Sequence, residues 1–272
     1  MQNVTSRLKL IASEVTRAID SGRQIPPFTT RPDGLSIDEA YRVTSLVHRL
    51  RERRGEVAIG RKIGFTNRTL WQRYNVHAPI WGYMYESTVH DLRTSSSCRA
   101  EEFPEPRIEP EIVFGLARDP ETWMDEEALL SCIDWIAHGF EVVQTIYPDW
   151  KFAAADTAAA NGLHGALFIG DRQQIGAKPR EWQRVLADFQ ITLYCDDQPV
   201  AGGRSSNVLG GPVLALGHLA RLLAQDPANS SLRANEIITT GTLTDAMPIK
   251  PNQRWRTSLS GIELKGIDLH FD

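Results

Sequence analysis

A chain of 272 residues is long enough for one large domain or two small ones. Hydrophobic residues make up 42% and charged residues 24% of the sequence, which excludes a disordered or fibrous chain. The 30 lysines and arginines against 34 aspartates and glutamates leave a net charge of −4, so the chain lacks the basic footprint that nucleic-acid binding requires.

The first fifty residues predict two helices. Leu8, Ile11 and Val15 recur at helical spacing. A second helix begins after Ser36, because Ser36 and Glu39 have the spacing of a capping box and apolar residues then recur every three or four positions. The proline-rich connector at residues 24–34 cannot be regular helix.

From about residue 55 the sequence turns to short β-like runs separated by glycine and proline. We predict helices at residues 125–137 and 213–224, and strands at residues 57–63, 108–116, 140–143, 167–169, 190–195, 236–240 and 262–271. Strands and helices do not alternate regularly, so a doubly wound parallel sheet is not expected. We predict an α+β fold with N-terminal helices and a mixed, mostly antiparallel β roll.

The chain shows no internal repeat and no low-complexity linker. We therefore predict a single domain over residues 1–272, with an N-terminal helical portion (1–55) and a β-rich catalytic portion (56–272). The three cysteines lie far apart and none belongs to a CxxC motif, which indicates a reduced, cytoplasmic chain and excludes a zinc finger. His218 and Arg221 interrupt the most apolar stretch, so we do not expect it to span a membrane.

The most informative segment is the predicted strand that carries Glu109 and Glu111. Residues two apart on a strand point to the same side, so both carboxylates project from an otherwise apolar run. Facing inward, they would repel each other unless a cation lies between them, and their hard oxygens suit Mg²⁺, Mn²⁺ or Ca²⁺. The alternative for this pair alone is an exposed edge-strand face, with Pro110 blunting the edge.

Two further charged residues lie in apolar, β-like settings. Glu141 stands in the predicted strand 140–143, and a third inward carboxylate favours an open metal site shared with Glu109 and Glu111. Lys62 lies in a glycine-punctuated strand, where a buried lysine can serve as an acid or base or bind a carboxylate. The alternative is an ordinary lysine whose ammonium reaches solvent.

Seven short motifs follow one another along nearly the whole chain: LSIDEAY at 35–41, GRKIGFT at 60–66, EPEI at 109–112, EVV at 141–143, DWK at 149–151, VLGGP at 208–212 and TTGTL at 239–243. In this order they resemble the fumarylacetoacetate hydrolase superfamily. Within it, the closer similarity is to the branch of 2-oxopent-4-enoate hydratases and 4-oxalocrotonate decarboxylases. The resemblance implies a mixed β roll that usually assembles into homo-oligomers.

The resemblance also implies roles for individual residues. Glu109, Glu111 and Glu141 match glutamates that hold Mg²⁺ or Mn²⁺. Lys62 matches a lysine beside the substrate, and Thr242 matches a residue near the substrate carboxylate.

Two further residues take expected roles from the same similarity. Glu86 matches a frequent acid near the cleft, so we expect a catalytic role for it. Asn161 stands where the family reads asparagine, so we expect it to bind substrate.

The chain departs from the family pattern near the expected site. Gln144, Thr145 and Ile146 replace the usual Asp-Ser-Arg, which removes an acid and an arginine. His164 stands where a small hydroxyl residue is usual, and we predict a catalytic role for it. The alternative is a loop histidine with satisfied hydrogen bonds. These departures leave the identity of the substrate open.

The function that the resemblance implies is a Mg²⁺-dependent lyase of aromatic catabolism, which hydrates a 2-hydroxy-2,4-dienoate or 2-oxo-4-enoate through a metal-stabilised enolate. The alternatives are a 4-oxalocrotonate-type 2-oxo acid decarboxylase, an acylpyruvate-type C–C hydrolase, and a catalytically silent partner subunit. The expected partners are the small acid and further copies of the chain, with a hetero-complex with a related enzyme as the alternative assembly. Nucleic acid and membranes are not expected partners.

Overall fold

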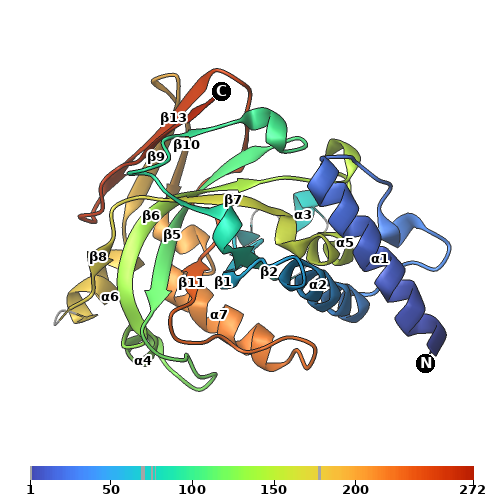
Figure 1. The fold of residues 1–272 in the computed structure, drawn as a ribbon. Coiled ribbons are helices and arrows are strands. Elements are labelled where there is room, and N and C mark those ends of the chain that lie inside the picture. The colour runs from blue at the N-terminus through green and yellow to red at the C-terminus, as the bar shows by residue number, and fades with distance from the viewer. Residues whose placement is uncertain (1, 69–70, 75, 77, 177–178) are drawn as a thin grey trace.

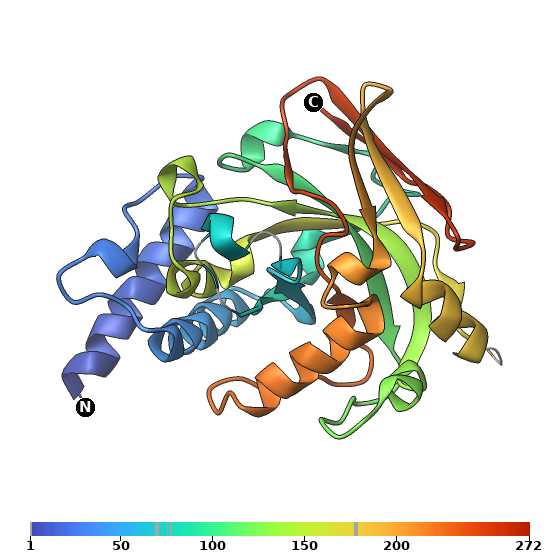
Figure 2. The same cartoon turned by 180° about the vertical axis from the view of Figure 1, so that it is seen from behind.

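The structure is a computed structural model that describes residues 2–68, 71–74, 76, 78–176 and 179–272. In this part of the chain the strands form two mixed sheets, and α7 lies beneath the strongly curved main sheet (Figure 1). Seen from behind, the N-terminal helices lie at the opposite end of the molecule from the second sheet, which carries the C-terminus (Figure 2). The predicted α+β class with a mixed, mostly antiparallel β roll is confirmed.

Two long helices, α1 (Gln2–Ser21) and α2 (Ile37–Glu52), form the N-terminal portion. The predicted capping box is confirmed, since the Ser36 hydroxyl accepts from the Glu39 amide and the Glu39 carboxylate accepts from the Ser36 amide. The buried sides of both helices share one apolar cluster with α5 (Ala154–Ala159) and with Val143 of the main sheet. The other helices are α3 (Trp71–Tyr74), α4 (Glu126–Leu130), α6 (Pro179–Ala187) and α7 (Pro212–Ala224).

The main sheet has the strand order β2-β1-β11-β5-β6-β7-β3, with β12 beside β5 and β8 beside β6. Within it β1 pairs with β11, and β3 with β7, in parallel, whereas the β5–β6 pair at its centre is long and antiparallel. The bounds are β1 (Ala58–Gly64), β2 (Ile80–Tyr85), β3 (Val89–Asp91), β5 (Arg107–Leu116), β6 (Ile133–Val143), β7 (His164–Ile169), β8 (Gln173–Gln174), β11 (Ile237–Thr239) and β12 (Met247–Pro248).

The second sheet has the order β10-β9-β13-β14-β4, and its β14–β4 pair is parallel. It packs on one end of the main sheet, where Ile108 and Phe140 share an apolar cluster with Trp255 and Leu269. Its strands are β4 (Ser97–Cys98), β9 (Gln190–Cys195), β10 (Gln198–Arg204), β13 (Gln253–Ser260) and β14 (Asp268–Phe271).

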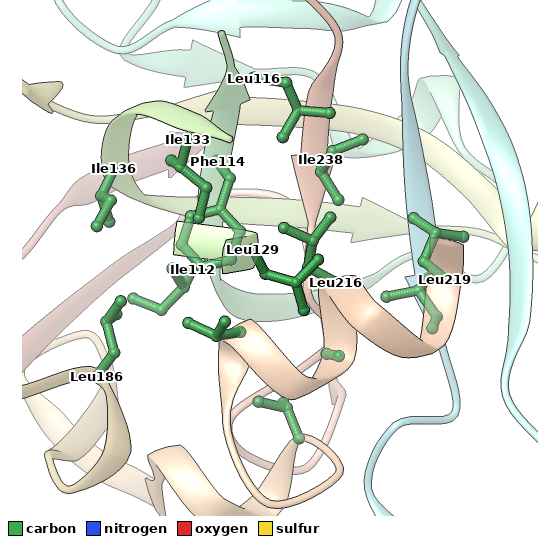
Figure 3. Packing of buried hydrophobic residues seen from close by; sticks show 14 of the residues in the cluster. Ile112, Phe114, Leu116, Leu129, Ile133, Ile136, Leu186, Leu216, Leu219 and Ile238 are labelled. Atoms are coloured by element: carbon green, nitrogen blue, oxygen red, sulfur yellow. The ribbon is translucent and has the colours of Figure 1, made fainter. Parts of the chain in front are cut away.

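The largest apolar cluster lies between one face of β5 and α7. Ile112, Phe114 and Leu116 of β5 lie in this cluster with Leu216 and Leu219 of α7 (Figure 3). Alternate residues of a strand point to opposite faces, so the odd-numbered residues of this part of β5 lie on the other face of the sheet. The packing against α7 therefore decides which face is left for the site.

The predicted helix over residues 125–137 is wrong beyond its first turns. Asp125 does cap α4, because its side chain accepts a hydrogen bond from the Ala128 amide. However, α4 ends at Leu130 and β6 begins at Ile133. The β-branched and aromatic residues that follow, together with the hydrogen bonds that β5 offers, outweigh the helical pattern.

The predicted strand over residues 262–271 is right only for its last four residues, which form β14. Gly261 has a φ of +85°, and a Cβ on Gly266 would lie 2.1 Å from the Thr257 carbonyl oxygen. The segment between them is therefore an irregular connection whose apolar residues Ile262 and Leu264 are nevertheless buried.

One helical stretch of the described chain, Ser205–Ala224, is long and apolar enough to cross a membrane by length and composition. The sequence predicts that its polar residues prevent this. In the structure most of the stretch is buried, and the apolar residues of α7 belong to the largest core cluster. Packing inside the molecule therefore accounts for its apolar character.

Candidate metal centre and active site

Three glutamates from the two central strands meet on one face of the main sheet. Glu109 and Glu141 lie opposite each other in the β5–β6 pairing, and Glu111 lies two residues further along β5. Because residues two apart share a face, the strand register alone brings the three side chains together. One carboxylate oxygen of each lies within 4.8 Å of the other two. Glu111 and Glu141 are fully buried, whereas Glu109 is half-buried.

The two buried glutamates each have one hydrogen-bonded oxygen. Oε2 of Glu111 accepts a 2.6 Å hydrogen bond from the Gly241 amide, and Oε1 of Glu141 accepts one of 2.8 Å from Nδ1 of His164. Their other oxygens, Oε1 of Glu111 and Oε2 of Glu141, are buried and have no hydrogen-bond partner. The Lys62 ammonium lies 3.1 Å from Oε2 of Glu141. Oε1 of Glu111 has neither a hydrogen bond nor an ion pair, which is costly for a buried carboxylate oxygen, and a cation beside it would remove that cost.

Burial and one ammonium group set the electrostatics of the cluster. Burial raises the pKa of Glu109 to about 7 and the pKa of Glu111 well above its ordinary value, and the charge on Glu141 adds to both effects. Burial also acts to raise the pKa of Glu141, but Lys62 and the hydrogen bond from His164 outweigh it and lower this pKa. Burial alone would lower the pKa of Lys62, yet the carboxylates, Glu141 first, raise it. Lys62 and Glu141 are therefore a charged pair.

The donor set fits a hard divalent cation. Mg²⁺, Mn²⁺ and Ca²⁺ all prefer oxygen ligands, and three carboxylates on one side leave further coordination positions open for water or substrate oxygens. Oε1 of Glu111, which has no hydrogen-bond partner, and Oε2 of Glu141, which pairs with Lys62, would supply two of the ligand atoms. The cluster can therefore hold a metal ion, in agreement with the role that the sequence predicts for these glutamates.

A cavity lies beside the cluster, and Lys62 and Glu109 form part of its wall. Lys62 is the cationic side chain among the described lining residues, and most of the others are apolar. The lining residues are Lys62, Gly64, Phe65, Thr66, Asn67, Ile80, Glu109, Val143, Trp150, Gly162, Leu163, Thr242 and Ala246. The cavity can therefore accept a small anion whose remaining atoms are hydrocarbon.

Two threonines line this cavity. The Thr242 hydroxyl, for which the family resemblance implies a place near the substrate carboxylate, donates a 2.9 Å hydrogen bond to the Thr244 carbonyl. The Thr66 hydroxyl is buried and has no hydrogen-bond partner. It packs against Gly241, where a Cβ would lie 1.8 Å from Oγ1 of Thr66. Thr66 and Gly241 lie in the GRKIGFT and TTGTL motifs, but the sequence does not show the contact between these distant segments.

Trp150 is a second cavity residue without a role assigned from sequence. Its indole N–H donates to the Glu105 carbonyl, and the Arg107 guanidinium lies 4.0 Å from its ring centroid. These contacts fix the ring at the cavity wall. The DWK motif could have drawn attention to Trp150, but a motif gives only the position of a residue along the chain and not the groups that it contacts.

The structure places three predicted site residues, Asn161, Glu86 and His164, outside the described cavity lining. Both ends of the Asn161 amide are bonded to the backbone of Tyr83, with its oxygen accepting from the amide and its nitrogen donating to the carbonyl. Asn161 therefore completes the edge of β2 and is absent from the described cavity lining. Glu86 is exposed at the start of the 3-10 helix η3 (Glu86–Thr88) and belongs neither to the cluster nor to that lining. His164 is buried and contacts Glu141, but it too is absent from the described lining.

The fold and the cluster agree with what the chain is similar to. The sequence model of the fumarylacetoacetate (FAA) hydrolase C-terminal family matches residues 60–265. The chain therefore belongs to the fumarylacetoacetate hydrolase family, and the resemblance noted from its motifs is confirmed.

Relatives that match over most of the chain include hydratases and a decarboxylase. The chain is 30% identical to the 2-hydroxyhexa-2,4-dienoate hydratase of Comamonas testosteroni, covering 90% of each chain, and 28% identical to the 2-keto-4-pentenoate hydratase of Paraburkholderia xenovorans (strain LB400), covering 92% of this chain and 90% of that one. Among solved structures, a 4-oxalocrotonate decarboxylase from Pseudomonas putida G7, complexed with magnesium and adipate, superposes with a TM-score of 0.88 over 98% of both chains at 21% identity.

Proposed function

We propose that the chain is a metal-dependent hydro-lyase that adds water to a small 2-hydroxy-2,4-dienoate or its 2-oxo-4-enoate tautomer. The observation that carries this proposal is the trio Glu109, Glu111 and Glu141, of which the last two are fully buried, beside a cavity whose described lining holds one cation, Lys62. The trio fits a divalent ion, and the cavity fits a monoanion with a hydrocarbon tail. The names of the two hydratase relatives support the same reaction class.

The three glutamates would hold Mg²⁺ or Mn²⁺, whose oxygen preference their carboxylates satisfy. A bound ion of this kind supplies Lewis acidity, which stabilises the negative charge of an enolate. Lys62 holds a proton at Nζ within the same cluster and can pass it to, or receive it from, the dienoate as the dienol becomes a ketone. When the dienol takes this proton at C5 and loses its 2-hydroxyl proton, it becomes a conjugated 2-oxo-3-enoate, and water can then add to its 4-position.

The other cavity residues would bind and enclose the acid. Thr242 and Thr66 present hydroxyl groups in the wall, where we expect the substrate carboxylate. Val143, Trp150 and Leu163 form an apolar part of the wall, which would exclude bulk water from the tail of the acid. A buried apolar wall penalises a second carboxylate unless it is paired. For this reason we favour hydration of a monocarboxylate over decarboxylation of oxalocrotonate, which carries two.

We also propose that the chain works as a homo-oligomer in the cytoplasm. All three cysteines are free, which supports a reducing compartment. Trp123 and Leu10 are 76% and 72% exposed, and large apolar side chains of this kind are candidates for subunit contacts. Light scattering should give a mass that is a multiple of 30.5 kDa, and a monomer at all concentrations would contradict this proposal.

The proposed reaction is tested with 2-hydroxypenta-2,4-dienoate and either Mg²⁺ or Mn²⁺. We expect its ultraviolet absorbance to disappear, a product heavier than the substrate by one water, and loss of turnover with EDTA. Oxalocrotonate is assayed in parallel for released CO₂. Release of CO₂ without hydration would establish the decarboxylase instead. Metal binding without turnover of either acid would identify a catalytically silent subunit.

A further inference from the structure

His164, the first residue of β7, connects a carboxylate of the proposed metal centre to a short helix. Its side chain is 1% exposed. Nδ1 lies 2.8 Å from Oε1 of Glu141, and Nε2 lies 2.9 Å from the Thr88 hydroxyl in η3. The Thr88 hydroxyl is in turn held by the backbone of Tyr85. Both ring nitrogens are therefore engaged, and the ring cannot turn without breaking two buried hydrogen bonds.

A β-bulge directs this side chain toward Glu141. Two successive residues of β6 pair with Ala166 and His164, which leaves Gly165 as an extra residue on β7. In a regular strand His164 would share the face of Ala166, two residues away, which is the face opposite to Glu141. The extra residue moves its side chain to the carboxylate face. A Cβ on Gly165 would lie 2.8 Å from the Val142 carbonyl oxygen, so the bulge requires glycine.

The chain reaches this bulge through a strained segment. Asn161, Gly162 and Leu163 have φ values of +56°, +65° and +63°, and two of them are not glycine. Such backbone persists only where surrounding contacts hold it, and it clusters at functional sites. Here the Asn161 amide supplies the contact, through its two hydrogen bonds to Tyr83. The strained segment therefore delivers His164 to a defined position.

We propose that His164 is a positioning residue of the metal centre, which holds Oε1 of Glu141 so that Oε2 alone faces the ion. The inference rests on the proposed function, because it takes Glu141 as a ligand. Oε2 is the oxygen of Glu141 that His164 does not bond, and it pairs with the Lys62 ammonium at 3.1 Å within the cluster. Because His164 is absent from the described cavity lining, it acts through Glu141 and not on the substrate. This replaces the catalytic role that the sequence predicts for it.

The test is Mn²⁺ binding to the full-length chain, measured by titration calorimetry and by the electron paramagnetic resonance signal of free Mn²⁺. His164→Ala removes both hydrogen bonds, and we expect it to weaken Mn²⁺ binding by about 10–100-fold. His164→Asn keeps an N–H near the position of Nδ1, so we expect it to recover most of that loss. These readouts do not depend on turnover.

His138→Ala is the matched control. His138 is also buried, and both of its nitrogens make 2.9 Å hydrogen bonds, one to the main-chain carbonyl of Glu111 and one to the Thr257 hydroxyl. It therefore matches His164 in burial and bonding, but it touches no carboxylate group. We expect His138→Ala to lower the melting temperature and to leave Mn²⁺ affinity unchanged.

Two results would overturn the inference. One is wild-type Mn²⁺ affinity in a folded His164→Ala protein, and the other is an equal loss of affinity in His138→Ala, which would show that disrupting any buried histidine weakens the site. If His164→Ala does not fold, His164→Asn and Thr88→Val decide, because Thr88→Val removes the far anchor alone and should weaken Mn²⁺ binding less than tenfold but measurably. A wild-type chain that binds no Mn²⁺ would contradict the proposed function itself, whereas wild-type binding that none of these variants alters contradicts the inference alone.

Discussion

Glu111 is the residue whose charge the cluster most needs. It is fully buried, the Gly241 amide holds one of its oxygens, and the other oxygen is unpartnered. Glu111→Gln keeps the shape of the side chain but removes the charge and one ligand oxygen. We expect kcat/KM and Mn²⁺ affinity to fall by at least about 100-fold, with the melting temperature nearly unchanged. Dienoate kinetics, calorimetry and thermal unfolding measure the three quantities.

Glu86→Gln is the comparison for that variant. Glu86 is an exposed acid, and the structure places it outside the cavity lining. We expect kcat/KM to stay within about twofold of wild type, as surface substitutions usually have small effects. A tenfold loss would show instead that the catalytic role predicted from sequence is correct.

His138 gives the stability a predictable dependence on pH. Burial lowers the pKa of His138 to about 4 in the folded chain, against about 6.5 in an unfolded chain. Between these values the unfolded chain binds more protons, so His138 destabilises the fold as pH falls below 6.5 and has no such effect above it. Between pH 7 and pH 5 we expect the unfolding free energy of wild type to fall by about 2 kcal/mol more than that of His138→Gln. The unfolding free energies are measured by urea unfolding at each pH. If they change equally with pH in the two proteins, the result contradicts the burial of a neutral imidazole.

At the same scale, the sequence predicts the part of the site that depends on strand periodicity. Two glutamates at i and i+2 and a third in the paired strand are enough to anticipate the trio, and Lys62 follows from its apolar setting. The places of Asn161 and Glu86 depend on the edge of β2, a strand that the sequence does not reveal. Motif similarity gives the position of such residues along the chain, but it does not say which backbone group takes up their hydrogen bonds.

At the scale of elements, the connection between β11 and β12 forms one side of the site. Gly241 has a φ of +94°, donates its amide to Glu111, and has no room for a Cβ beside Thr66. We expect Gly241→Ala to displace the connection, to lower the unfolding free energy by at least about 2 kcal/mol and to weaken Mn²⁺ binding.

Gly55→Ala is the matched control for that variant. Gly55 has a similar φ of +87°, but nothing lies within 4 Å of where its Cβ would be. It carries the backbone strain without the clash, so we expect a loss of about 1–2 kcal/mol and normal Mn²⁺ binding. Chemical denaturation and calorimetry on both variants separate strain from steric displacement, and equal metal affinities would contradict the role given to Gly241.

The elements that the sequence predicts well are those with a strong local signal. The capping box begins α2, Pro212 begins α7, and β9 has the predicted bounds. The failures are elements whose state is decided by partners. Residues 133–137 have a pattern compatible with a helix, yet they pair with β5 and form part of β6. The alternating pattern after Gly261 reflects burial of Ile262 and Leu264 in a connection that makes no regular ladder.

At the scale of the whole molecule, the helical portion and the sheet share a core. Val143 and Leu163 pack in the same cluster as α1 and α2, while they also line the cavity. The single-domain prediction therefore leads us to expect one cooperative unfolding transition, with coincident midpoints by circular dichroism and tryptophan fluorescence. Mn²⁺ at about 100 times its Kd should add about 2.7 kcal/mol, which for a chain of this size raises the melting temperature by about 5–10 °C.

Two separate transitions would contradict this expectation, and so would a metal effect confined to one probe. Glu111→Gln serves as the control, since it should show the transition without the shift. The measurement thus tests the domain organisation and the metal centre independently.

The shared cluster also bears on how this scaffold can diversify. The family model begins at residue 60, so α1 and α2 lie outside the matched region, yet they stand behind Val143 and Leu163. Substitutions that change the size of α1 and α2 side chains packed against Val143 and Leu163 would alter the apolar wall of the cavity. They would leave the three glutamates unchanged. The amino-terminal helices are accordingly where an engineer should randomise codons in order to admit acids with longer or branched chains.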